Sequence, residues 1–270
     1  MDNNTYSLDN IIEAYKSLAE EKKWVEKLKD KIINKILSND LELEYSKEYI
    51  ISFIRKFEYS YTFNKELFSN IYRTSWERYF EHLRGVVEIL LEIPNPTPDK
   101  ILIALFHDTK EDIEEANFEN IAFVSRDYKI AIAVEAISKK NWSEYSENKS
   151  EWKGLRDIEY FSHLESFEKM ANYVIYIAKD KWYELTIEEV QEITQNIFDV
   201  KYADRIHNLS TQWDLDNIEK VKEKIAQTEK YFLEWAKIIN PIAYSKLKSE
   251  ILKLKLQIEQ YDKKISDIIN

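Results

Sequence analysis

Apolar side chains recur at helical spacing along almost the whole chain. Between residues 8 and 37, apolar positions such as Ile11, Tyr15 and Leu18 lie three, four or seven residues apart and therefore share one helix face. The same spacing predicts further helices over residues 46–57, 71–91, 97–106, 121–137, 161–178, 187–197, 196–209 and 218–239. We therefore expect an all-α fold.

Breaks in this pattern predict where the helices end. Three of the four prolines lie in the segment 94–98, which predicts a loop, and Thr97 or Asp99 is expected to cap the helix that follows. Residues 141–157 are polar and charged and contain Gly154, so they are expected to form a loop. Pro241 should end the helix before it.

The chain is expected to comprise three parts. Residues 1–45 form an N-terminal helical extension, residues 46–240 a central domain, and residues 241–270 a C-terminal helix. The last part carries a three-heptad apolar seam that begins at Leu247. This helix either packs on its own domain, the alternative we favour because three heptads make a marginal coiled coil, or forms a homodimer.

Composition excludes several classes of function. Two glycines in 270 residues cannot build a dinucleotide-binding loop or a P-loop, and the absence of cysteine excludes disulfides, thiolate zinc sites and thiol nucleophiles. The net charge of −11 argues against a nucleic-acid partner. No apolar run is long enough to span a membrane, and the polar N-terminus does not resemble a signal peptide. We expect a soluble, cytoplasmic protein.

Histidine and aspartate residues stand beside apolar helical runs at three places far apart in the sequence. His82 follows one run, His107 and Asp108 end another, and Asp204 lies in a third. An ionised Asp108 in an apolar interior would cost several kcal/mol unless a cation or hydrogen-bond donors satisfied it. Each cluster alone is more typical of a hydrogen-bonded structural residue, but together the four side chains suit Mn²⁺, Fe²⁺, Co²⁺, Ni²⁺ or Zn²⁺.

Two motifs resemble a known family. The order of these residues is similar to the HD superfamily of metal-dependent phosphohydrolases, and residues 107–112, HDTKED, resemble the HDxxED motif of RelA/SpoT-type alarmone hydrolases. Residues 201–209, KYADRIHNL, are similar to the KLADRLHNM segment of that family, and residues 231–236, YFLEWA, resemble its single-domain members. The resemblance covers residues 70–240 and implies an HD-domain helical bundle with extra terminal helices.

The resemblance also implies roles for residues around a Mn²⁺ ion. It implies four metal ligands, namely His82, His107, Asp108 and Asp204. Glu111 and Asp112 would activate or position water, since a carboxylate near the ion can act as a general base. His207 is not expected to be a ligand but to support Asp204 or cap the core, and Gly85 is expected to permit close helix packing.

A further set of residues is implied in binding the substrate. By the resemblance, Arg73 packs against a guanine base, and Asn208 and Thr211 contact the nucleoside and phosphates. An acidic protein needs a locally basic cleft for an anionic substrate, and its candidate cations are Arg73, Lys110, Lys139, Lys201 and Arg205. The chain departs from the family at Thr74, where a lysine is common, and by an insertion at 181–195 that forms a lid or an extra helix.

The predicted activity is the Mn²⁺-dependent removal of pyrophosphate from the 3′ position of guanosine tetra- or pentaphosphate, (p)ppGpp, giving GDP or GTP. One alternative is an HD hydrolase for another phosphorylated nucleotide: an adenine alarmone, a nucleoside monophosphate or NADPH. The other is a non-catalytic, nucleotide-binding helical protein. The metal and Glu-Asp sets favour catalysis.

Overall fold

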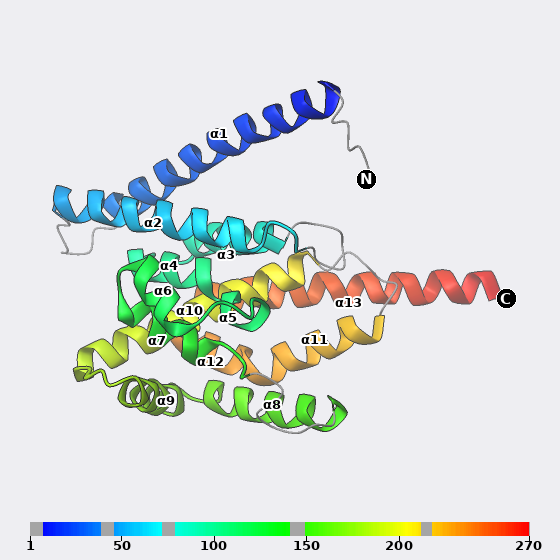
Figure 1. The fold of residues 1–270 in the computed structure, drawn as a ribbon. Helices are drawn as coiled ribbons and strands as arrows, with labels where there is room; N and C mark the ends of the chain where they lie inside the picture. The colour runs from blue at the N-terminus through cyan, green and yellow to red at the C-terminus, as the bar shows by residue number, and fades with distance from the viewer. Residues whose placement is uncertain (1–7, 39–45, 72–78, 141–148, 212–217, 270) are drawn as a thin grey trace. The chain divides into compact units, whose positions relative to one another are not determined.

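A computed structural model describes residues 8–38, 46–71, 79–140, 149–211 and 218–269, and every regular element in these ranges is a helix (Figure 1). The helices are α1 (Leu8–Ser38), α2 (Lys47–Leu67), α3 (Tyr79–Glu92), α4 (Pro98–Phe106), α5 (Thr109–Asp112), α6 (Phe118–Ser125), α7 (Tyr128–Ile137), α8 (Lys149–Leu164), α9 (Phe167–Asp180), α10 (Ile187–Ser210), α11 (Ile218–Tyr231), α12 (Leu233–Ile239) and α13 (Pro241–Ile269). The prediction of an all-α fold is confirmed. The chain divides into two compact units, residues 1–54 and 55–270.

Helix α10 is the centre of the second unit. It contacts α3, α4, α7, α9 and α13, and its consecutive residues Val200, Lys201, Tyr202 and Ala203 are all buried. A helix enclosed on all sides brings every one of its faces against a neighbour. Polar residues on α10 therefore lie inside the unit, where they need partners from other helices.

Threonine caps define the starts of α4 and α10. The Thr97 hydroxyl accepts a hydrogen bond from the Lys100 backbone N–H at 3.3 Å, which confirms Thr97 as a cap. Thr186 and Glu189 form a reciprocal capping box at the start of α10. The segment 181–195 is consequently a short turn plus the first turns of α10, and α10 continues unbroken where two helices were predicted.

Four further predictions were wrong in their boundaries, the first of them the predicted helix 161–178, which divides where the Ser166 side chain caps α9. The predicted helix 121–137 divides into α6 and α7, because Arg126 adopts a left-handed conformation (φ 54°) and the Asp127 side chain caps α7. Of the segment 141–157, expected to be a loop, residues 141–148 lie outside the described residues and residues 149–157 belong to α8, which the buried Tyr160, Phe161 and Leu164 anchor. The predicted helix 218–239 divides at the buried Phe232.

The apolar seam of α13 packs within its own unit. Leu247, Ile251, Leu254 and Ile258 are buried, and α13 contacts α10, α11 and α12. Packing on the same domain was the favoured alternative, and the homodimer remains an untested prediction. Among the described residues, none of the helices combines the length and apolar character needed to cross a bilayer.

Candidate metal centre

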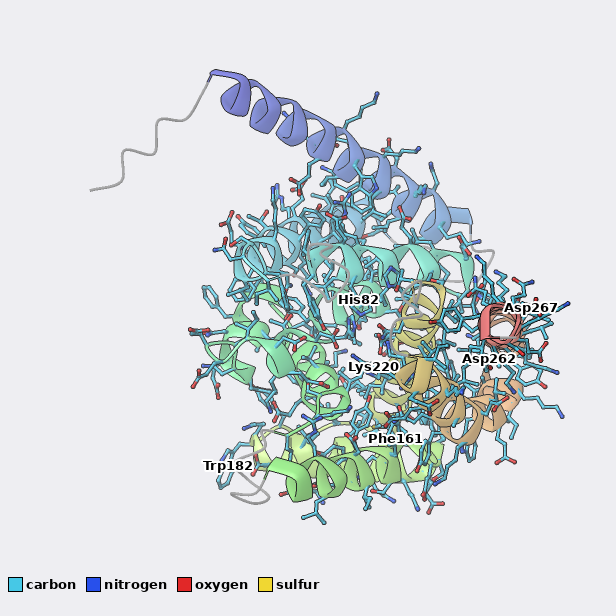
Figure 2. The ribbon with its side chains drawn as sticks, turned by 90° about the vertical axis from the view of Figure 1, so that its right-hand side faces the viewer. His82, Phe161, Trp182, Lys220, Asp262 and Asp267 are labelled. Carbon is cyan, nitrogen blue, oxygen red and sulfur yellow. The ribbon has the colours of Figure 1, made fainter. Side chains whose placement is uncertain are left out.

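Three helices of the second unit bring the four predicted ligands together. His82 comes from α3, His107 and Asp108 follow α4, and Asp204 lies on α10. Ligand atoms of His82, His107 and Asp108 lie within 4.8 Å of one another, and Figure 2 places His82 in the interior among the helices. Asp204 Oδ1 completes the group, at 3.2 Å from His82 Nε2 and 3.7 Å from His107 Nε2. Residues more than 120 positions apart thus share one buried site.

The imidazole of His107 points a nitrogen lone pair into this cluster. Its Nδ1 lies 2.8 Å from the backbone carbonyl of Ala104, which can only accept a hydrogen bond, so Nδ1 must carry a proton. In the neutral ring, Nε2 is then an acceptor, and it faces His82 Nε2 at 3.2 Å and Asp108 Oδ2 at 3.1 Å. With a neutral His107, acceptors converge here, so either a proton on Nε2 or a metal ion is needed between them.

The pKa values of the two aspartates also indicate that the cluster requires positive charge. Burial raises the pKa of each carboxyl, but His107 beside Asp108, and Lys201 and His107 beside Asp204, outweigh burial and hold both pKa values well below their usual range. Burial alone would lower the pKa of His107, but Asp108 and Asp204 raise it to about 10. The cluster therefore stabilises positive charge between its side chains, as a divalent ion or as a proton. Two imidazoles and two carboxylates are a donor set that fits a divalent transition metal.

A buried ammonium compensates one of the two aspartates. Lys201 Nζ lies 3.1 Å from Asp204 Oδ2 and 5.4 Å from the ring centroid of Tyr160. Burial lowers the pKa of Lys201, but Tyr160, Asp204 and Glu111 raise it well above its usual value. The site thus holds two buried carboxylates and one buried ammonium, and the remaining negative charge is matched by a proton on His107 or by a bound cation.

Glu111 and Asp112 lie at the edge of this cluster, on α5. Both residues are exposed to solvent, yet the surrounding chain and the charge of Asp108 raise the pKa of the Glu111 carboxyl to about 7. Glu111 Oε1 accepts the backbone N–H of Lys139 at 2.8 Å. Desolvation by the surrounding chain and the charge of Asp108 also raise the pKa of Asp112. A carboxyl that titrates near neutral pH beside this cluster is suited to general acid–base work.

Tyr79 is a site residue that the sequence analysis missed. Its hydroxyl donates to Asp108 Oδ2 at 2.8 Å, and its ring stacks on Phe68 with centroids 5.0 Å apart. Stacking on Phe68 holds the Tyr79 ring in position, and the Tyr79 hydroxyl in turn holds the Asp108 carboxylate. The available signal was its position one helical turn before His82, which places both side chains on one face of α3.

His207 contacts His82 rather than only supporting Asp204 as predicted. Their Nδ1 atoms lie 2.9 Å apart, so one ring donates to the other. If His82 donates, its Nε2 carries a lone pair into the cluster, and His207 fixes the tautomer of that ligand. Gly85 makes this contact sterically feasible, because a Cβ there would lie 2.0 Å from His207 Nε2. The predicted close packing at Gly85 is therefore confirmed, with His207 as its partner.

The predicted substrate-binding residues make mostly internal contacts. Asn208 Nδ2 donates to Asp204 Oδ1 at 2.5 Å, and the Thr211 hydroxyl donates to the His207 carbonyl at 2.8 Å. The Lys139 ammonium lies 3.4 Å from Asp157 Oδ1. The guanidinium of Arg205 lies 4.6 Å from the ring centroid of Phe232. Arg73 lies outside the described residues.

The remaining candidate cation, Lys110, is paired with Glu135 on α7.

A scan of the chain against models of protein families finds no match, and a search among curated proteins finds none either. The geometry of the cluster and the sequence motifs around it are therefore the evidence for a function.

Proposed function

We propose that this chain is a metal-dependent phosphohydrolase of the HD type, acting on the 3′-pyrophosphate of guanosine tetra- or pentaphosphate. One observation carries the metal-dependent part: side chains of His82, His107, Asp108 and Asp204, all potential metal ligands, converge in one cluster. The choice of substrate follows from the sequence motifs at 107–112 and 201–209, which surround these ligands.

The ligand set would hold a divalent ion, for which we propose Mn²⁺. When bound, such an ion supplies Lewis-acid stabilisation of charge on phosphoryl oxygens and lowers the pKa of water. Glu111 would receive the proton of the attacking water, since its pKa of about 7 lets it accept and return protons near neutral pH. Tyr79 and Asn208 would hold the Asp108 and Asp204 carboxylates in place through their hydrogen bonds.

Positive charge near the cluster supports an anionic substrate. The Lys201 and Lys139 ammonium groups lie 5.4 and 5.0 Å from the ring centroid of Tyr160, beside Glu111 and Asp204. Lys201 pairs with Asp204, and the charge of Lys139 acts on Glu111, so both would favour a phosphoryl group there despite the net charge of −11. Attraction confined to the site is what an acidic hydrolase of anionic nucleotides requires.

A nucleotide panel tests this proposal. The protein is stripped with a chelator, reloaded with Mn²⁺ and incubated with guanosine tetraphosphate, adenine alarmones, nucleoside monophosphates and NADPH. We expect GDP and pyrophosphate from guanosine tetraphosphate, and no product without metal. Hydrolysis of a different nucleotide would identify that nucleotide as the substrate in place of guanosine tetraphosphate. Hydrolysis of none of them would contradict the proposed catalytic activity.

A matched pair of variants separates catalysis from metal binding. Glu111→Gln preserves shape but removes the proton acceptor, so we expect metal content to persist while hydrolysis falls about 100-fold to 10,000-fold. The control is Asp180→Asn at the exposed end of α9, which should change neither property. Unchanged turnover in Glu111→Gln would reject the role of that residue.

A further inference from the structure

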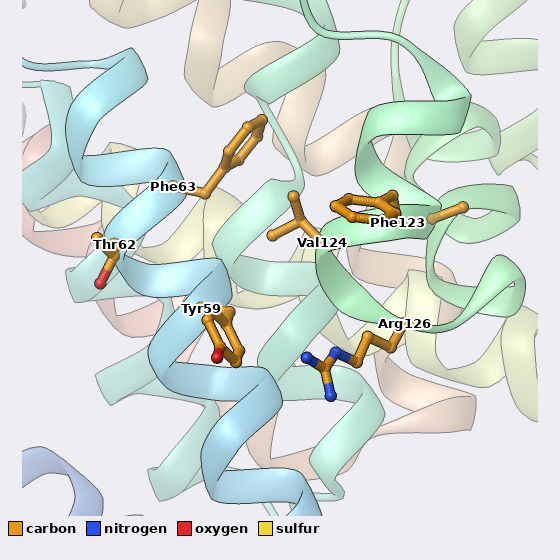
Figure 3. Close-up of a pocket in the computed structure, with 7 residues that line it drawn as sticks. Tyr59, Thr62, Phe63, Phe123, Val124 and Arg126 are labelled. Carbon is orange, nitrogen blue, oxygen red and sulfur yellow. The ribbon is translucent and has the colours of Figure 1, made fainter.

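A cavity lies between α2 and α6, and none of the predicted metal ligands lines it. It has a volume of about 680 Å³, within the range of sites that bind small molecules. Aromatic rings form much of its wall: Tyr59 and Phe63 from α2, and Phe123 from α6 (Figure 3). Phe123 is 83% exposed and Tyr59 56% exposed, so this wall presents apolar surface to water.

A guanidinium stands at the rim of this groove. Figure 3 shows Arg126 and Tyr59 facing each other across it, and the Arg126 Cζ atom lies 5.1 Å from the Tyr59 ring centroid. Contact with a ring face leaves the N–H groups at the edge of the guanidinium available for an anion. Within the ranges that the structure describes, Arg126 has no carboxylate partner, whereas neighbouring Lys56 and Lys129 pair with Asp127 and Glu189.

The backbone at Arg126 is also unusual. Its φ of 54° is the left-handed conformation that ends α6, where glycine is favoured and residues with a side chain are strained. An arginine here is therefore not explained by the local backbone. Its side chain contributes instead to the groove, as the only cation among the residues lining it in the described chain.

We propose that this groove binds a small aromatic anion, a carboxylate or sulfonate on a planar apolar body. The body would lie against Phe63, Val124 and Phe123, and the anion would take two parallel hydrogen bonds from Arg126. The positive charge of Arg126 favours an anionic ligand, and the aromatic wall of the groove favours a planar ligand. The site is independent of the metal cluster and of the activity proposed for it.

The fluorescent probe 1-anilinonaphthalene-8-sulfonate tests this site on the full chain, because it joins an aromatic body to a sulfonate. We expect saturable binding of one probe per chain. Arg126→Gly should weaken binding about tenfold or more while leaving thermal stability equal or higher, since glycine suits the left-handed position. Phe123→Ser should weaken binding about fivefold. A merely destabilised protein would instead bind more probe.

Two controls make the result specific. The uncharged analogue N-phenyl-1-naphthylamine should bind Arg126→Gly as well as it binds the parent chain, because it has no anion to lose. Lys222→Gln changes a cation in the smaller groove between α11 and α13 and should leave probe affinity unchanged. Affinities that are equal in the parent, Arg126→Gly and Phe123→Ser would overturn the proposal. Self-association of the chain that Phe123→Ser abolishes would also overturn it, by assigning the groove to a second copy.

Discussion

Two buried polar clusters lie between the same two helices, and they are balanced differently. Near the start of α4, the Lys100 ammonium lies 2.8 Å from Asp199 Oδ2 on α10, and Asn240 Nδ2 donates to Asp199 Oδ1 at 2.8 Å. Two turns along α4, His107 and Asp108 meet Asp204 of α10. Both clusters are taken out of water, so each must satisfy its charges internally.

The first cluster is complete by itself. One carboxylate faces one ammonium, and Lys100 Nζ also donates to the Asn95 carbonyl at 2.9 Å. The second cluster has two carboxylates and one ammonium, so it is balanced only when a proton on His107 or a bound cation supplies the second positive charge. The comparison teaches that a buried ion pair is a structural device, whereas a buried excess of acceptors indicates a site for a cation.

The largest expected effect is the loss of metal binding and hydrolysis when the cluster of predicted metal ligands is changed. Asp108→Ala removes a ligand and should abolish metal retention, with hydrolysis falling by about a thousandfold or more as several kcal/mol of charge stabilisation are lost. Helix content should be unchanged, because His107 can lose its proton once the Asp108 carboxylate is removed, which leaves no unpaired buried charge. Metal analysis, activity and far-UV circular dichroism check this, and a variant that kept its metal would refute the ligand assignment.

Breaking the balanced cluster should have the opposite signature. Asp199→Ala leaves the Lys100 ammonium, 6% exposed, without its counterion, and should lower the free energy of unfolding by about 3–5 kcal/mol. Urea denaturation measures this loss. Metal affinity of the folded protein should stay the same. A stable Asp199→Ala variant would show that the pair contributes little.

The two glycines of the chain provide a smaller test of how the site is held. Gly85→Ala places a methyl group against His207 and should displace the ring that contacts His82, weakening metal binding by about 10-fold to 100-fold. Titration calorimetry with Mn²⁺ measures the affinity. The matched control is Gly154→Ala on α8, where nothing lies within 4 Å of the new Cβ. It should leave affinity unchanged and stabilise its helix by about 0.5–1 kcal/mol.

The smallest effect concerns an acid beside the balanced pair. Burial, with Asp127 and Glu192, raises the pKa of Asp99 to about 6. The folded chain thus binds this proton more tightly than the unfolded chain, and stability should fall as pH rises from about 4 to 6. Two pKa units correspond to about 3 kcal/mol, which partial exposure reduces to about 1 kcal/mol.

Asp99→Asn should remove that penalty. We expect a gain of about 1 kcal/mol in unfolding free energy at pH 7.5 and none at pH 4, by urea denaturation in the presence of chelator. Asp180→Asn, an exposed carboxylate, is the control at both pH values. An equal gain at pH 4 would attribute the effect to something other than ionisation.

Local sequence signals predicted the helices better than their junctions. Apolar spacing is a property of each segment, so it identified the buried helix that ends at Phe106 and the seam of α13. The division at Arg126 depends on one residue entering a left-handed conformation, and the helix over 149–157 depends on anchoring by the buried Phe161. Neither is visible in the periodicity of its own segment.

The sequence by itself determined the all-α class, a cap at Thr97 or Asp99 and the identity of the four side chains that meet, because residue type and helical spacing are encoded locally. Only the tertiary structure decided which side chains from other helices lie behind them: Tyr79 on Asp108 and His207 on His82. The contacts of Asp204 with Lys201 and Asn208, by contrast, join residues three and four apart on α10 and follow from helical spacing. Partners from other helices are chosen by the packing of α3, α4 and α10, and the distances between helices are not written in any one of them.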